Sequence, residues 1–365
     1  MAVTTNPELA QTEFSAAELL ADHRIAEPLV ARGVRCHGGF DETGAYVSPR
    51  TRFRVPAIAA WQAKHQAEFG TAVLDAPLET WPAHYPNVAQ AKFLVRAGVP
   101  EPLMASLTRI GTVEGFGANI RHLTPGNLQR HFVEGIDGTA MAHLGQGLFE
   151  AHGRDEAGWE QEAGHKDMWF AARDIAFDDR SADVDIDAML ERMGFGGGAA
   201  GGAPAPRALP DDVDANVELI AGLMARVLLI EIQAFHTFAW AEAWLSDPDL
   251  VSGDGEAARL VSYIRADETP HVGYLKTALT EMRDRTWVGA SGRRYAGSDM
   301  IGTIWARSLE QSLGAGRAVT RKATIGEVEH WCRQRSDAAR ILEEFHALAD
   351  DAAGGLEGGH EPRPS

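Results

Sequence analysis

Cysteine is nearly absent from this 365-residue chain, which contains only Cys36 and Cys332. Two cysteines are too few for a disulfide framework or for a metal site built on thiolates. Positive charge is also scarce, because 34 Lys and Arg stand against 52 Asp and Glu, which gives a formal net charge of −18. This acidity argues against nucleic acid or an anionic membrane surface as a partner.

The chain also lacks a long uninterrupted apolar run. Its most apolar stretch, residues 219–245, contains Arg226, Glu231 and Glu242, which predicts a buried helix and not a membrane span. The first residues show no basic and then apolar signal sequence, so a cytoplasmic location is expected. Hydrophobic residues make up 45% of the chain, which is enough for a sizeable core.

Helical periodicity predicts an all-α fold. Four long helices are expected to form a bundle, at 126–146, 155–177, 213–246 and 255–284. Shorter helices are expected near 16–32, 56–68, 86–98, 100–113, 297–315 and 324–349. The connector at 33–56 is rich in Gly, Pro and aromatic residues and has room for a short hairpin.

These helices predict a five-part organisation along the chain. The expected parts are a disordered tail at 1–14, an N-terminal helical extension at 15–124, the bundle at 125–285, C-terminal helices at 286–350 and a disordered tail at 351–365. Within the bundle, the Gly-rich residues 178–212 are expected to form a long crossover between the second and third helices.

Two Glu-x-x-His pairs, Glu162 with His165 and Glu268 with His271, lie on apolar helical faces. Residues three apart share one face of a helix, so each pair directs a carboxylate and an imidazole to the same side. The pattern alone is weak, since it occurs twice more near the C-terminus. The apolar setting of these two pairs therefore carries the prediction that they bind a metal.

Two further glutamates can complete such a site. Glu231 lies in a very apolar helix and is roughly as far before the turn near 246–255 as Glu268 is after it, so the two should be level on adjacent antiparallel helices. Glu134 relates to Glu162 in the same way. Glu114, in a similar Val-Glu-Gly context, is the rival of Glu134, but it is 48 residues from Glu162 and fits that pairing less well.

Four carboxylates carry a charge of about −4, which two divalent ions would neutralise, so such a site could be buried without net charge. The order Glu, Glu-x-x-His, Glu, Glu-x-x-His resembles the ferritin-like di-iron carboxylate superfamily, in its oxidase and oxygenase branch. The resemblance implies a ferritin-like four-helix bundle and six catalytic metal ligands: Glu134, Glu162, His165, Glu231, Glu268 and His271.

The second motif has the Asp-Glu-x-x-His form, so the resemblance places Asp267 behind the ligands, accepting the free N–H of a ligand histidine such as His165. Gln161 occupies the matching position of the first motif and departs from the pattern. Pro270 departs from it as well and should kink or unwind its helix.

The resemblance implies an O2-dependent oxidase or monooxygenase that acts on a small organic substrate with an Fe/Fe or a mixed Mn/Fe pair. The chain has no flavin or nicotinamide fingerprint, so electrons would come from an external donor or from the substrate. A homodimer is compatible with the sequence, whereas nucleic acid and membrane partners are not expected. Two alternatives stay open: a non-enzymatic iron-storage or ferroxidase protein, and a structural helical bundle with a vestigial site.

Overall fold

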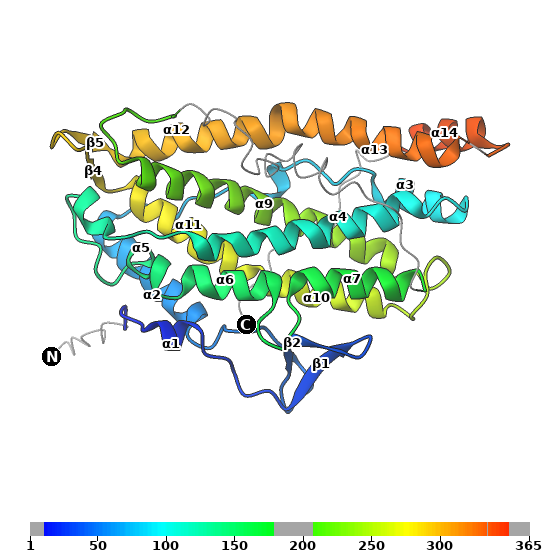
Figure 1. Ribbon diagram of the computed structural model, residues 1–365, viewed down its shortest axis with the longest axis horizontal. Helices are drawn as coiled ribbons and strands as arrows, with labels where there is room; N and C mark the ends of the chain where they lie inside the picture. Colours follow the sequence, from blue (N-terminus) through cyan, green and yellow to red (C-terminus); the bar gives the residue numbers. More distant parts are fainter. Residues whose placement is uncertain (1–10, 179–206, 334, 350–365) are drawn as a thin grey trace, which may run out of the picture.

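The computed structural model of the protein describes residues 11–178, 207–333 and 335–349, which are mostly helical and include two small antiparallel sheets (Figure 1). The α-helices are α1 (Ala16–Leu19), α2 (Arg54–Phe69), α3 (Val88–Arg96), α4 (Glu101–Gly117), α5 (Ala140–His143), α6 (Leu148–Ala157), α7 (His165–Ala176), α9 (Ala215–Leu245), α10 (Glu256–Asp267), α11 (Thr269–Arg283), α12 (Gly297–Leu309), α13 (Gly316–Cys332) and α14 (Ala338–Ala347). The strands are β1 (Glu27–Ala31), β2 (Val34–Phe40), β3 (Tyr46–Val47), β4 (Thr286–Val288) and β5 (Arg294–Ala296). Among the helices described, none is long and apolar enough to cross a membrane.

Most of the predicted helices are confirmed, but those at 16–32 and 126–146 are wrong, and those at 155–177 and 324–349 are each divided between two helices. The helix predicted at 16–32 ends at Leu19, and β1 and β2 follow it as the hairpin for which the connector had room. The helix predicted at 126–146 is replaced by irregular backbone, short 3₁₀ turns and the single turn of α5. The predicted crossover at 178–212 and the tails at 1–14 and 351–365 lie mainly or wholly outside the described residues.

Four helical rods run side by side along the molecule: α4, α6 followed by α7, α9, and α10 followed by α11 (Figure 1). Helix α4 packs on α6 and α7, α7 packs on α10, and both α10 and α11 pack on α9. Helices α12 to α14 extend along one side of this arrangement, where α12 contacts α9 and α13 contacts α4. The first rod is therefore α4, whereas the sequence predicted the first bundle helix later in the chain, at 126–146.

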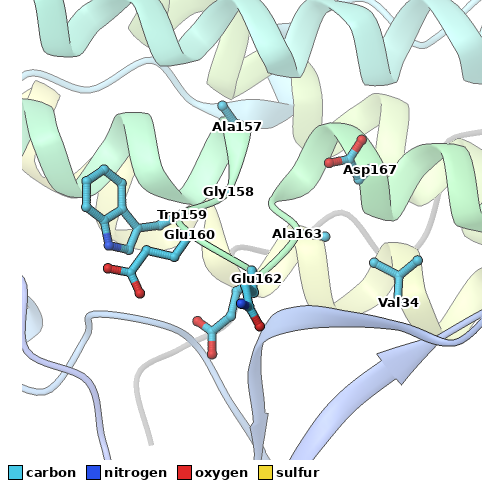
Figure 2. A pocket seen from close by; sticks show the side chains of 9 residues that line it. Val34, Ala157, Gly158, Trp159, Glu160, Glu162, Ala163 and Asp167 are labelled. Carbon is cyan, nitrogen blue, oxygen red and sulfur yellow. The ribbon is translucent and has the colours of Figure 1, made fainter.

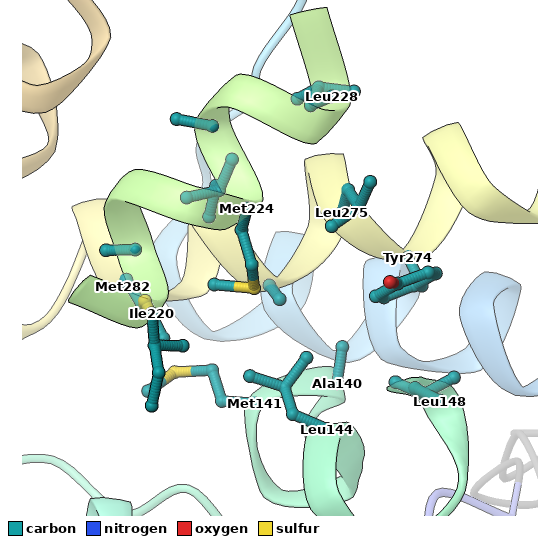
Figure 3. Close-up of a cluster of buried hydrophobic side chains, with 14 of the residues drawn as sticks. Ala140, Met141, Leu144, Leu148, Ile220, Met224, Leu228, Tyr274, Leu275 and Met282 are labelled. Atoms are coloured by element: carbon teal, nitrogen blue, oxygen red, sulfur yellow. The ribbon is translucent and has the colours of Figure 1, made fainter. Parts of the chain in front are cut away.

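Helix α9 is the longest element and begins at a clear signal. Asp214 is its N-cap, and the carboxylate accepts hydrogen bonds from the backbone N–H groups of Asn216 and Val217. Its apolar side chains pack against α5, α6 and α11 in one of the two main hydrophobic clusters of the protein (Figure 3). Met224 and Leu228 of α9 face Leu275 of α11 across this core. These contacts pack the first part of α9 against its neighbours, and Phe238, Trp240 and Trp244 pack the rest of α9 in the second cluster.

Two of the four rods are interrupted, and each interruption has a local cause. Between α10 and α11 the cause is Pro270, which has no backbone N–H and is tolerated only in the first turn of a helix. The interruption predicted at Pro270 is thereby confirmed. Between α6 and α7, Gly158 adopts φ 82° and the chain leaves the helix until His165. The sequence predicted one continuous helix over 155–177 there.

The loop between α6 and α7 is held by the N-terminal sheet. The strand order of this sheet is β1-β2-β3, and β2 extends its pairing to the loop. The N–H of His37 donates to the carbonyl of Ala163 at 2.9 Å, and the N–H of Ala163 donates to the carbonyl of Arg35 at 2.9 Å. The sheet therefore fixes the point at which α7 begins, and with it the position of His165.

Candidate metal centre

Ligand-type side chains from all four rods converge on one buried cluster in the middle of the molecule. The cluster consists of Glu114 from α4, His152 and Glu156 from α6, His165 from α7, Glu231 from α9, Glu268 from the junction of α10 and α11, and His271 from α11. These residues form two overlapping groups of four, and within each group one ligand atom per residue lies within 4.8 Å of the others.

The first group surrounds Nδ1 of His165. This nitrogen lies 2.9 Å from Oε1 of Glu268, 3.5 Å from Oε2 of Glu156 and 3.7 Å from Oε2 of Glu114. Three carboxylates and one imidazole therefore face one another across a few ångströms, and their carboxylates come from three different rods.

The second group surrounds Nδ1 of His271. This nitrogen lies 2.7 Å from Oε2 of Glu268 and 3.3 Å from Oε1 of Glu156, and Glu231 belongs to the same group. Glu268 and Glu156 thus direct one carboxylate oxygen to each group. Two carboxylates shared in this way can bridge two cations.

Several of these atoms satisfy no hydrogen bond among the described residues. Both oxygens of Glu156, Oε1 of Glu268 and Nδ1 of His165 are buried in the cluster without a hydrogen-bond partner. Burying polar atoms without partners is costly, and the cost rises for charged groups. Orphaned ligand atoms that converge on one space fit a pair of bound cations.

The charge of the centre fits the same pair. Glu114, Glu156, Glu231 and Glu268 carry about −4 when they are ionised, which two divalent cations neutralise. Asp155 and Asp267 are also buried, beside His271 and His165. The two buried guanidinium groups of Arg50 and Arg54 offset their negative charge. The whole centre therefore approaches neutrality with two divalent ions bound.

Neighbouring charges set the pKa values within the cluster. Burial lowers the pKa of His165, but the charges of Glu268 and Glu156 outweigh burial and raise it well above its usual value. Burial and the charge of Glu268 together hold the pKa of Glu231 well above its usual range. At Glu268 itself, burial is outweighed by the positive charges of His165 and His271, so its pKa lies well below the usual range. Divalent cations would have to compete with the protons that these groups retain.

Behind His271 stands Asp155. Nε2–H of His271 donates to Oδ2 of Asp155 at 2.8 Å, which turns Nδ1 toward the cluster. Two buried arginines compensate the aspartate: Nη2 of Arg54 lies 2.7 Å from Oδ2, and Nη2 of Arg50 lies 2.5 Å from Oδ1. Although burial raises the pKa of Asp155, the charges of Arg50 and Arg54 hold it well below its usual range.

Behind His165 stands Asp267, in the place that the sequence predicted. Nε2 of His165 lies 3.5 Å from Oδ2 of Asp267, and the hydroxyl of Tyr46 donates to the same oxygen at 2.9 Å. Nε2 of His37 lies 3.2 Å from it. Each of the two histidines therefore offers Nδ1 to the cluster and Nε2 to an aspartate that directly precedes a cluster glutamate. The two halves of the centre are built alike.

His152 belongs to the second group but differs from the other two histidines. Its Nε2 faces the cluster, 3.4 Å from Oε1 of Glu231 and 3.6 Å from Oε1 of Glu156. Its Nδ1 lies 3.1 Å from the hydroxyl of Tyr274. Burial, reinforced by the positive charge of His271, lowers the pKa of His152 to about 3, so this imidazole is neutral.

A surface pocket of about 280 Å³ lies beside the loop that interrupts the second rod (Figure 2). Ala157 and Ala163 line it at the two ends of the loop, and Glu160 and Asp167 add negative charge. Trp159, at the rim, is 41% exposed and stacks under the guanidinium of Arg154. The loop that begins after Gly158 therefore carries this large aromatic side chain to the surface.

Four of the six predicted ligands, His165, Glu231, Glu268 and His271, are brought together by the structure. Glu134 is not among them: it lies in irregular backbone, where its carboxylate accepts hydrogen bonds from the N–H and the hydroxyl of Thr286 at 2.7 and 2.9 Å. The prediction of Glu134 failed because the helix expected at 126–146 does not form. Glu114, the alternative that the residue counting had disfavoured, lies in the cluster where Glu134 was expected.

Glu162 is the second predicted ligand that lies outside the cluster. It sits in the loop before α7, with its side chain 35% exposed and Oε1 3.0 Å from Nη2 of Arg35. The ligand-type carboxylate on this rod is Glu156, which precedes His165 by nine residues and not by three. Glu156 is six residues further from His165 than the Glu-x-x-His spacing requires. Glu162 has that spacing by chance, because it lies in the loop between Glu156 and His165. One sequence signal could have identified Glu156 as the ligand-type residue, because the Asp155-Glu156 pair repeats the Asp267-Glu268 pair.

Comparison with known proteins identifies no similar protein. No family model matches the sequence, and no curated protein and no solved structure is significantly similar to it. The arrangement of the cluster is therefore the basis for assigning a function.

Proposed function

We propose that the protein binds two divalent transition-metal ions at this centre and uses them with O2 as an oxidase or monooxygenase of a small organic molecule. The single observation that supports the proposal is the pair of buried groups that overlap at Glu156, while Glu268 of one group also directs its second oxygen to His271 of the other. Glu156 and Glu268 each face both His165 and His271, and a simple buried ion pair would not need this arrangement. Two cations would account for the set Glu114, Glu156, His165, Glu231, Glu268 and His271, because each half of the cluster offers an imidazole and both Glu156 and Glu268 face both halves.

In this proposal the six ligands are Glu114, Glu156, His165, Glu231, Glu268 and His271. Oxygen-rich ligand sets with two imidazoles and no thiolate suit Fe or Mn, either as a like pair or as a mixed pair. When bound, such a pair supplies O2 binding and activation. The chain itself contributes burial, which excludes water, the hydrogen bond by which Asp155 orients the imidazole of His271, and the charge of Asp267, 3.5 Å from Nε2 of His165.

The proposed architecture is a ferritin-like bundle of α4, α6 with α7, α9, and α10 with α11. Each rod contributes to the ligand set, as in bundle-core sites that take one Glu from each of two helices and a Glu with a His from each of the other two. The departure from that pattern is the second rod, where the Glu and the His stand on opposite sides of a break. The proposed partners are the substrate and an external electron donor.

Metal content per chain tests the proposal. The full-length protein is purified with Fe and Mn supplied, and the metals are counted by elemental analysis in the wild type, in Glu231→Ala and in Glu156→Ala. Matched controls are Glu134→Ala and Glu162→Ala, since these glutamates have the same chemistry and lie outside the cluster. The expected result is about two metals per chain in the wild type and both controls, with a sharp loss in the two cluster variants.

Other outcomes separate the alternatives. Near-zero metal in the wild type would reject the metal centre and leave a structural helical protein. Many iron atoms per chain in a large cage-like assembly would favour iron storage. With two metals bound, O2 consumption that depends on an added organic substrate and reductant supports the oxidase or monooxygenase reaction. The loss of metal in the Glu134→Ala or Glu162→Ala protein, with Glu156→Ala unaffected, would contradict the ligand set proposed here.

A further inference from the structure

The ligand-type side chains of the second group include one histidine, His152, that has no counterpart in the first group. Its ring is fully buried and stacks on that of His271, with centroids 3.9 Å apart and an angle of 16° between the planes. The parallel rings bring Nε2 of His152 and Nδ1 of His271 to the same atom, Oε1 of Glu156, at 3.6 and 3.3 Å. Among the four residues of the first group, only His165 carries an imidazole.

A purely structural role does not account for this ring. A core histidine normally satisfies both nitrogens, and His152 satisfies only Nδ1, through the hydroxyl of Tyr274 at 3.1 Å. Its Nε2 has no hydrogen-bond partner among the described residues and is aimed at the carboxylates of Glu231 and Glu156. When Nδ1–H donates to Tyr274, Nε2 presents a lone pair to the cluster, as a metal ligand requires.

We infer that His152 is a third imidazole ligand, which binds through Nε2 to the metal held by Glu231 and His271 and makes the two metal subsites unequal. This inference rests on the proposed function and deepens it. One subsite then has two nitrogen ligands and the other has one, His165. Added nitrogen favours Fe²⁺ over Mn²⁺, because affinity rises along that series and imidazole suits Fe better than the hard oxygen ligands that suit Mn.

Tyr274 is the positioning residue in this arrangement. It lies on α11, one turn beyond His271, and its side chain is buried in the apolar cluster beside Leu148 (Figure 3). Its hydroxyl fixes the tautomer and the orientation of the His152 ring. Removal of the hydroxyl should therefore weaken the subsite of His152 without removing a ligand.

Competitive loading of the full-length protein tests the inference. Metal-free protein is equilibrated without O2 with equal concentrations of Fe²⁺ and Mn²⁺, desalted and assayed for both metals, and separate titrations with each ion give the stepwise affinities. The proteins are the wild type, His152→Ala, His152→Gln and Tyr274→Phe. The matched control is His143→Gln, since His143 is equally buried but bonds Thr139 and the backbone of Phe14, outside the cluster.

The wild type should bind two ions with unequal affinities and retain more Fe than Mn. Either His152 variant should lose roughly 10- to 100-fold in affinity at one subsite only and retain a lower ratio of Fe to Mn than the wild type, and Tyr274→Phe should show a smaller loss at the same subsite. His152→Gln preserves volume and polarity, so it serves if the alanine variant does not fold. Two ions bound with unchanged affinities and Fe:Mn ratio in the His152 variants would overturn the inference and leave the proposed function intact. A wild-type protein that binds no metal pair would reject both.

Discussion

Gly164 offers the sharpest test of how the interrupted rod builds the centre, because it lies directly before His165. A Cβ placed on Gly164 would lie 2.5 Å from the carbonyl oxygen of Asp155 and 2.8 Å from that of Glu156, and closer still to the backbone nitrogen of Gly158. All three contacts are with backbone, which cannot rotate away. The backbone dihedrals of Gly164, φ −93° and ψ −167°, are open to alanine, so the effect of Gly164→Ala is steric alone.

The magnitude follows from these distances. Non-bonded atoms settle at about 3.5 Å, so the start of α7 must move away from the end of α6 by roughly 1 Å. Metal–ligand distances tolerate only about 0.2 Å, and Nδ1 of His165 moves with its backbone. We expect Gly164→Ala to lower metal affinity by roughly 10- to 100-fold. The overpacking itself should cost about 1–3 kcal/mol of the free energy of unfolding.

The assay is a titration of metal-free protein with Fe²⁺ in the absence of O2, together with thermal unfolding. The control is Gly222→Ala in α9, where an added Cβ would meet no atom within 4 Å. That variant should bind metal normally and gain up to about 1 kcal/mol of helix stability. If Gly164→Ala bound two ions with wild-type affinity, the close approach of the two helix ends would not be what positions His165, and the reasoning would be refuted.

Three further predictions concern the surroundings of the centre. Tyr46→Phe removes the hydroxyl that donates to Asp267 and should lower metal affinity about 10-fold in the same titration, whereas Tyr263→Phe, whose ring stacks on Tyr46, should have no such effect. Saturation of the wild type with Fe²⁺ at 100 times the dissociation constant should raise the free energy of unfolding by about 2.7 kcal/mol per site, and an unchanged melting temperature would contradict metal binding to the folded state. Burial, against the hydrogen bonds from α5, raises the pKa of Glu281 from 4.5 to about 7. The folded state therefore holds a proton that the unfolded state releases, so stability should fall by about 3 kcal/mol as the pH rises from 4.5 to 7, and denaturant titrations of Glu281→Gln should lack this slope.

Much of the helical framework could be predicted because its signals are local. The apolar run of α9, its Asp214 cap and the Pro270 break are each visible within a few residues of sequence. The level placement of Glu231 and Glu268 followed from counting residues to a shared turn, and both lie in the cluster. Antiparallel helices with a short connection allow such counting because the rise per residue is constant.

The first half of the centre could not be predicted in this way. Counting from Glu162 assumed a continuous helix, and the loop between Gly158 and Gly164 invalidates that assumption. The same error eliminated Glu114, since its separation was measured to the wrong glutamate. What holds the loop is its pairing with β2 through Ala163, a contact with a segment more than a hundred residues earlier in the chain. No local pattern reports such a contact.

The polar side chains that compensate Asp155 and Asp267 have a consequence for the order in which the protein forms. His37, Arg54 and their neighbours are translated early, yet His37 meets Asp267 across 230 positions and Arg54 meets Asp155 across 101. Closing loops of this length is slow compared with forming single helices. A chain still on the ribosome cannot complete the centre before His271 has emerged. The cluster is therefore among the last parts of the molecule that can be completed, since it joins residues of the N-terminal sheet to the last of the four rods.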